Sequence, residues 1–198
     1  MDIEALRSIL SAVRRYEAER RMVIFGSSAL LITLSGASPA DLGVETTLDA
    51  DLLLDPDDES VRCVLDEAIG SDSEYDVANG FHADFVDARI ADDCFPRDWR
   101  ERLVPVPGFD GVFALSSGDT AAAKLLATAF ARLNRRMGRA TADRGLKDIS
   151  AIAVLLRAGL LDAAEVLQRL ESVELSPALV VEVGNVFEET KEAAGRPS

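Results

Sequence analysis

Residues 22–30 read Met-Val-Ile-Phe-Gly-Ser-Ser-Ala-Leu, and residues 47–52 read Thr-Leu-Asp-Ala-Asp-Leu. The first stretch opens with a short apolar run that stops at a glycine, which is typical of a buried strand closed by a tight turn. A helix is expected just after this turn, over residues 28–34. The second stretch belongs to a β-branched and leucine-rich run, residues 46–55, that ends at an Asp-Pro pair, so a second buried strand is predicted.

The remaining segments indicate a mixed half followed by a helical half. Apolar residues spaced by three and four predict an amphipathic helix over residues 2–20. Further strands are expected at 81–90, 103–106 and 112–115, and further helices at 57–69, 117–134, 143–156, 162–170 and 177–193. This order predicts an α+β fold, in which a mixed β-sheet flanked by helices precedes a C-terminal helical bundle. We expect an α/β domain over residues 1–115 and a helical domain over 116–198 packed on it, because the join is only a few residues long.

Composition narrows the classes of protein to consider. The N-terminus lacks the apolar core of a signal peptide, and the longest uncharged run is broken by glycine, serine and proline, so a cytoplasmic protein that does not enter a membrane is expected. A net charge of −14 disfavours extended nucleic-acid binding.

One basic segment, residues 132–147, is either a solvated helix end or a patch that faces phosphates. Cys63, Cys94 and the single histidine do not have metal-ligand spacing, and both thiols are expected to be reduced and structural.

Asp49 and Asp51 are the residues that suggest chemistry. Residues two apart on a strand project to the same face, so the two carboxylates would lie side by side. Their repulsion is relieved most simply by a divalent cation, and an oxygen-only ligand set favours magnesium or manganese. In a chain with 35 acidic residues an Asp-x-Asp pair is also typical of a solvated surface. The leucine-rich strand around this pair favours a site, and Gly26-Ser27 at a helix start would offer N–H groups to a nucleotide phosphate.

These two stretches together resemble the Gly-Ser and Asp-x-Asp signature of the nucleotidyltransferase superfamily, whose members have a DNA-polymerase-beta-like fold. The spacing is similar to that of AbiEii-type toxins and related minimal enzymes. Those relatives also carry a Lys-Leu-x-Ala helix and a later Lys-Asp helix. The counterparts in this sequence are Lys124-Leu125-Leu126-Ala127 and Lys147-Asp148-Ile149. The resemblance covers about residues 20 to 157.

The resemblance implies a role for each matching residue. Nucleotide binding would fall to Gly26, Ser27, Lys124 and Lys147, metal binding to Asp49, Asp51 and a third strand carboxylate, and acid or base chemistry to Asp148. Asp84 is a better third carboxylate than Asp87, because residues three apart on a regular strand cannot both face one site. The implied reaction moves a nucleoside monophosphate from an NTP to a hydroxyl on RNA or protein, with Mg²⁺ or Mn²⁺, in a toxin–antitoxin or phage-defence setting.

Several structural readings stay open beside these roles. Lys124 could extend along a packed helix to reach solvent, Lys147 and Asp148 could be a surface pair, and His82 and Trp99 are expected to be structural. A second function is a non-catalytic antitoxin or binding partner, favoured by the acidic surface and by Glu45, where relatives often carry arginine. A third is modification of cationic aminoglycosides, which an acidic surface would attract.

Overall fold

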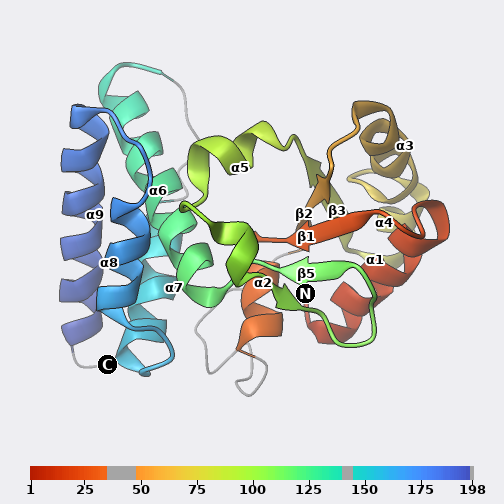
Figure 1. Ribbon diagram of the computed structural model, residues 1–198, viewed down its shortest axis with the longest axis horizontal. Coiled ribbons are helices and arrows are strands. Elements are labelled where there is room, and N and C mark those ends of the chain that lie inside the picture. Colours follow the sequence, from red (N-terminus) through yellow and green to blue (C-terminus); the bar gives the residue numbers. More distant parts are fainter. Residues whose placement is uncertain (35–47, 140–144, 197–198) are drawn as a thin grey trace.

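The computed structural model describes residues 1–34, 48–139 and 145–196. The mixed fold predicted from the sequence is confirmed: an open five-stranded sheet is flanked by helices and followed by C-terminal helices (Figure 1). In chain order the elements are α1 (Ile3–Tyr16), β1 (Arg21–Ile24), α2 (Gly26–Thr33), β2 (Asp49–Asp55), α3 (Glu59–Ile69), α4 (Glu74–Asn79), β3 (His82–Val86), α5 (Arg89–Cys94), the 3-10 helix η1 (Trp99–Arg102), β4 (Val104–Pro105), β5 (Val112–Ala114), α6 (Ser117–Arg136), α7 (Gly145–Arg157), α8 (Ala163–Glu171) and α9 (Pro177–Gly195).

The sheet has the strand order β3-β2-β1-β5-β4. Strand β1 runs antiparallel to β2 and parallel to β5, β2 runs parallel to β3, and β4 runs antiparallel to β5. The register places Asp51 of β2 opposite Asp84 of β3. Because paired residues of neighbouring strands project to the same face, this register determines where the acidic side chains meet.

Strand β2 is buried along most of its length. Ala50, Leu52 and Leu54 face the core as expected from alternation, and Leu53 on the other face is also fully buried. Helices therefore cover both faces of the sheet beyond its acidic end, which explains why the sequence of β2 is a continuous leucine run rather than an alternating one.

Two hydrophobic clusters make up the core. The first joins the sheet to α1 and α3, and the second joins α6, α7, α8 and α9. Helix α2 belongs to both, because Ala29 packs in the first cluster while Leu30 packs in the second. In Figure 1 the four C-terminal helices stand together at one end of the molecule, with α1, α3 and α4 at the other end. Whether residues 1–115 and 116–198 are separate domains stays a prediction.

Several details differ from the sequence-based expectation. Helix α2 begins at Gly26 rather than at residue 28, so the Gly-Ser pair forms its first turn. The strand expected over residues 81–90 ends at Val86, because the chain turns at Asp87: its carbonyl accepts a hydrogen bond from the Ile90 N–H (3.0 Å) and its carboxylate accepts one from the Arg89 N–H (2.9 Å), and helix α5 follows. Helix α4 was not predicted from the sequence; the Ser73 hydroxyl caps its start and Gly80, with φ of 74°, ends it.

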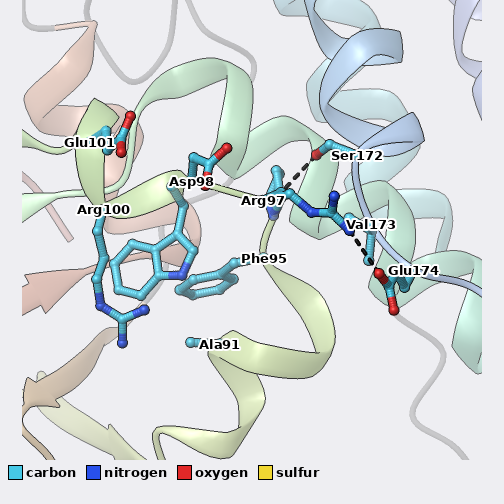
Figure 2. Close-up of a pocket in the computed structure, with 11 residues that line it drawn as sticks. Ala91, Phe95, Arg97, Asp98, Arg100, Glu101, Ser172, Val173 and Glu174 are labelled. Atoms are coloured by element: carbon cyan, nitrogen blue, oxygen red, sulfur yellow. Dashed lines mark hydrogen bonds and ion pairs between the residues drawn. The ribbon is translucent and has the colours of Figure 1, made fainter.

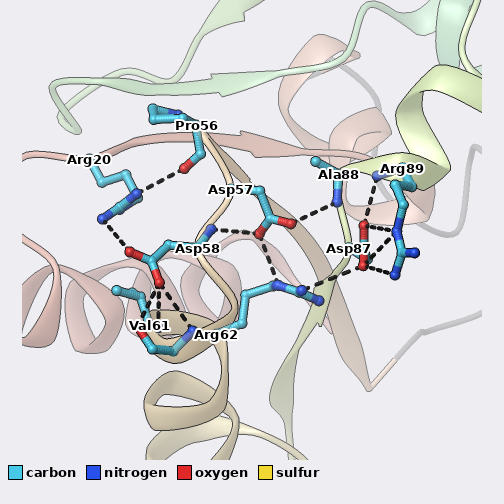
Figure 3. A network of polar contacts seen from close by, with 10 residues as sticks. Arg20, Pro56, Asp57, Asp58, Val61, Arg62, Asp87, Ala88 and Arg89 are labelled. Carbon is cyan, nitrogen blue, oxygen red and sulfur yellow. Dashed lines mark hydrogen bonds and ion pairs between the residues drawn. The ribbon is translucent and has the colours of Figure 1, made fainter.

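A polar network ties the C-terminal ends of β2 and β3 together (Figure 3). The Asp57 carboxylate accepts hydrogen bonds from the backbone N–H groups of Asp58 (2.8 Å) and Ala88 (3.2 Å). Arg62 on α3 lies between two acids, with its Nε 2.9 Å from Asp57 and its terminal nitrogen 3.5 Å from Asp87. Hydrogen bonds from Arg89 lower the pKa of Asp87. Asp87 is therefore an ionised anchor of the turn.

A fully buried acid, Asp119, links η1 to the C-terminal helices. Its carboxylate accepts hydrogen bonds from Arg102 at 2.8 and 2.9 Å and from the hydroxyl of Ser116, and Arg169 Nε lies 3.5 Å away. A second bridge nearby is exposed. Arg97 pairs with Glu174 (2.7 Å), and its backbone N–H donates to the Ser172 hydroxyl (Figure 2).

In the part of the chain that the structure describes, no helix combines the length and the apolar character needed to cross a lipid bilayer.

We expect the two bridges to contribute very differently to stability. Asp119→Ala leaves two largely buried guanidinium groups without their shared carboxylate and is expected to lower the free energy of unfolding by about 3–5 kcal/mol. Glu174→Ala removes a solvent-exposed pair and is expected to cost less than about 1 kcal/mol. Urea unfolding followed by circular dichroism measures both. Equal losses in the two variants would contradict this ranking.

Candidate functional site

Three carboxylates meet at the end of the sheet where β2 begins. One oxygen each from Asp49, Asp51 and Asp84 lies within 4.8 Å of the others. Asp49 and Asp51 are half-buried, and Asp84 is exposed. The predicted side-by-side placement of the first two is therefore found. Asp84 joins them because it is paired with Asp51 across β2 and β3. Asp87 instead forms a hydrogen-bonded ion pair with Arg89.

Gly26 allows this close packing. It has a φ of 63°, and a Cβ built on it would lie 2.0 Å from Oδ2 of Asp51. A residue with a side chain would be strained here by the positive φ, and the Asp51 carboxylate would have to move to make room for it. The preceding residue, Phe25, donates its backbone N–H to the carbonyl of Asp51 (3.1 Å). The Gly-Ser segment and the Asp-x-Asp strand are thus in direct contact.

Ser28 is a residue of the site that sequence reasoning missed. It is completely buried, and its hydroxyl donates a hydrogen bond to the main-chain carbonyl of Asp49 (3.2 Å). The neighbouring Ser27, to which the resemblance gives a phosphate-binding role, lies half-buried in the first turn of α2. The sequence shows two adjacent serines after Gly26 but carries no signal that separates their environments.

An aromatic row supports the turn from the side of α5. The ring of Phe25 packs edge-on against Phe95 (5.4 Å between centroids), and Phe95 packs in the same way against Trp99 (5.2 Å). Trp99 is almost fully buried beneath the Arg100 guanidinium, so the prediction that it is a packing residue is confirmed. Phe95 also borders a cavity of about 480 Å³ lined by Arg97, Arg100 and Glu174 (Figure 2).

The donor set fits a hard divalent cation. All three groups are carboxylates, and three like charges at this spacing repel one another unless protons or cations neutralise them. Burial, and to a smaller degree the charge of Asp84, raise the pKa of Asp66 on the neighbouring helix α3. The acidic cluster could therefore hold a metal ion, and an oxygen-only ligand set is the kind that Mg²⁺ and Mn²⁺ prefer.

Lys124, to which the resemblance gives a nucleotide-binding role, and Asp148, to which it gives an acid or base role, contact each other. Lys124 Nζ on α6 lies 2.8 Å from the Asp148 carboxylate on α7, and both side chains are largely buried. Lys124 therefore does not simply extend into solvent. Asp148 is joined to α6 rather than being one half of a surface pair, while its neighbour Lys147 is exposed on α7.

The other residues singled out from the sequence have structural contacts. His82 Nδ1 lies 3.1 Å from the Asp76 carboxylate, which fits the structural role expected of this histidine. In the basic segment, Arg132 pairs with Glu189 (2.6 Å) and Arg136 with the buried Glu182 (2.7 Å), so part of its charge is neutralised by α9. Glu45 and the residues 140–144 of the basic segment lie outside the described residues.

Comparisons with protein-family models, with curated proteins and with solved structures find no match to this chain.

Gly26→Ala tests the contact between the turn and the carboxylates. We expect it to lower the free energy of unfolding by about 1–2 kcal/mol for the positive φ alone, and to displace Asp51, which would weaken Mn²⁺ binding about 10–100-fold. Gly80→Ala is the matched control, because Gly80 also has a positive φ but open space around its Cα. Urea unfolding and calorimetric Mn²⁺ titration measure the two effects. Equal Mn²⁺ affinity in both variants would show that the contact with Asp51 is unimportant for the site.

Proposed function

We propose that this chain is a metal-dependent nucleotidyltransferase that moves a nucleoside monophosphate from an NTP to a hydroxyl acceptor on RNA or protein. The observation that carries the proposal is the convergence of Asp49, Asp51 and Asp84 beside the glycine turn that opens α2. The motif resemblance pointed to these residues from three separate stretches of sequence. If the acidic residues were only a solvated surface, a glycine turn packed directly against one of the carboxylates would not be expected.

Each part of the site has a task in such a reaction. The carboxylates would hold Mg²⁺ or Mn²⁺, which when bound neutralises phosphate charge and activates the attacking hydroxyl. The first turn of α2 offers backbone N–H groups and the Ser27 hydroxyl to the phosphates of the nucleotide. The acceptor oxygen would form a bond to the α-phosphorus as the bond to pyrophosphate breaks, and the hydroxyl proton would leave to solvent or to a carboxylate. Lys124 would add positive charge near the phosphates.

The proposal extends to the setting that the resemblance implies. Transfer of a nucleotide to RNA or to a protein would inactivate the acceptor, as befits a toxin–antitoxin or phage-defence component. The strong negative charge of the chain suits a compact acceptor, or a basic partner protein, better than a long nucleic acid.

Loss of a metal ligand should abolish transfer. Incubation with Mg²⁺ and each α-labelled NTP, in the presence of total RNA and protein, is expected to label an acceptor. Asp49→Asn and Asp84→Asn should each reduce the labelling by about 100-fold, because each removes an anionic ligand. Asp87→Asn serves as the control, since Asp87 follows the C-terminal end of β3, away from the end of the sheet where β2 begins, and pairs with Arg89. Labelling that survives in the first two variants, or that falls equally in the control, would contradict the site assignment.

A second candidate is a non-catalytic relative that acts as an antitoxin or protein-binding partner. The ion pair between Lys124 and Asp148 favours it, because each residue already has a structural partner. Calorimetric titration with Mg²⁺ and each NTP separates the two functions. The enzyme should give heat of binding that Lys124→Met reduces, whereas a binding module should give none.

The same variant also has a stability effect. Lys124→Met is expected to lower the free energy of unfolding by about 3 kcal/mol, because Asp148 loses its partner in a largely buried place. The double variant Lys124→Met/Asp148→Asn should recover much of that loss. Nucleotide heat in the wild type that neither variant alters would show that the pair has no part in binding.

A further inference from the structure

We propose that Ser28 is a positioning residue, whose hydroxyl holds the main chain of Asp49 in the place from which the three carboxylates converge. The expected effect of Ser28 on metal affinity rests on the proposed function, because it requires a metal ion at the three carboxylates. The anchoring of Asp49, the first residue of β2, by α2 can be measured without any metal ion.

The argument starts from the end of the ladder between β1 and β2. The last paired residues are Ile24 and Leu52, and one further bond joins the Phe25 N–H to the Asp51 carbonyl. Carbonyls of alternate residues along a strand point to the same side. The carbonyl of Asp49 therefore points to the side of β1, at a position that β1 no longer reaches because the chain has turned into α2 at Gly26.

The Ser28 hydroxyl supplies the hydrogen bond at that position. It donates to the Asp49 carbonyl at 3.2 Å from the first turn of α2, in a place with no solvent exposure. On the other side of β2, the Leu48 carbonyl accepts the His82 N–H of β3 (3.0 Å). The beginning of β2 is thus held from both sides. Removing the Ser28 hydroxyl deletes one of these two hydrogen bonds, so the strand start should loosen without Ser28.

The loosening would matter for the ligand set. Asp49 is the first residue of β2, and Leu48 before it is 61% exposed, so a fraying strand end would carry the Asp49 carboxylate away from Asp51 and Asp84. Groups that orient metal ligands typically change metal affinity by about 10–100-fold when they are removed. Ser28 would act in this way through the main chain, while the carboxylates themselves stay unchanged.

Ser28→Ala tests this with two measurements. In the metal-free protein, hydrogen exchange of the His82 amide should become about tenfold faster, while the Leu115 amide, which donates to Ile24 within the sheet, should be unchanged. Mn²⁺ affinity measured by calorimetry should fall about 10–100-fold. Unchanged His82 exchange together with unchanged Mn²⁺ affinity would overturn the inference.

Thr190→Val is the matched control. Thr190 is equally buried, and its hydroxyl donates to the Val186 carbonyl in α9 (2.7 Å), so this variant also removes a buried hydroxyl-to-carbonyl bond. It should lower the Tm and leave both His82 exchange and Mn²⁺ affinity unchanged. If it weakened Mn²⁺ binding as much as Ser28→Ala, the effect would be global and the inference wrong. If the wild type bound no Mn²⁺, the proposed metal site would fail, and the exchange of His82 alone would decide the anchoring role of Ser28.

Discussion

The Asp51 carboxylate fills the space in which any other residue at position 26 would place its side chain. The β1–β2 ladder brings the two chain segments together, and glycine at position 26 leaves room for this carboxylate beside the turn. Two hydrogen bonds accompany this contact, from the Phe25 N–H to the Asp51 carbonyl and from the Ser28 hydroxyl to the Asp49 carbonyl. The acidic cluster and the start of α2 therefore form one unit.

Helix α2 also connects the site to the C-terminal half. Its residue Leu30 packs among the helices of the second hydrophobic cluster, while its first turn contacts β2. The pair of Lys124 and Asp148 fixes α6 to α7 within that half. Rigid support of this kind matters for a site built from charged groups, since small displacements of ligands change their interaction strongly. Helix α2, which carries the Gly-Ser pair, therefore packs against both halves of the chain.

Most of the fold and the acidic part of the site could be predicted from the sequence, since both follow from local patterns. Alternation placed Asp49 and Asp51 on one face, and the spacing of three excluded a joint role for Asp84 and Asp87. What could not be predicted depends on packing between distant segments. The contact of Lys124 with Asp148 requires the docking of α6 on α7, and the different environments of Ser27 and Ser28 depend on where the helix begins. Helix α5 was missed because the turn at Asp87, made by bonds of its carbonyl and its carboxylate to the next residues, interrupts a segment that was read as one strand.

Among the described residues, strand β3 is an edge strand beside β2, and it contributes one of the three carboxylates. Edge strands have fewer partners and open more readily than central strands. A cation shared by Asp51 and Asp84 would cross-link the edge to its neighbour, so opening of that edge and release of the ion would be coupled. The bound ion would then stabilise the pairing of β3 with β2, and repulsion between the carboxylates would weaken this pairing when the ion is lost.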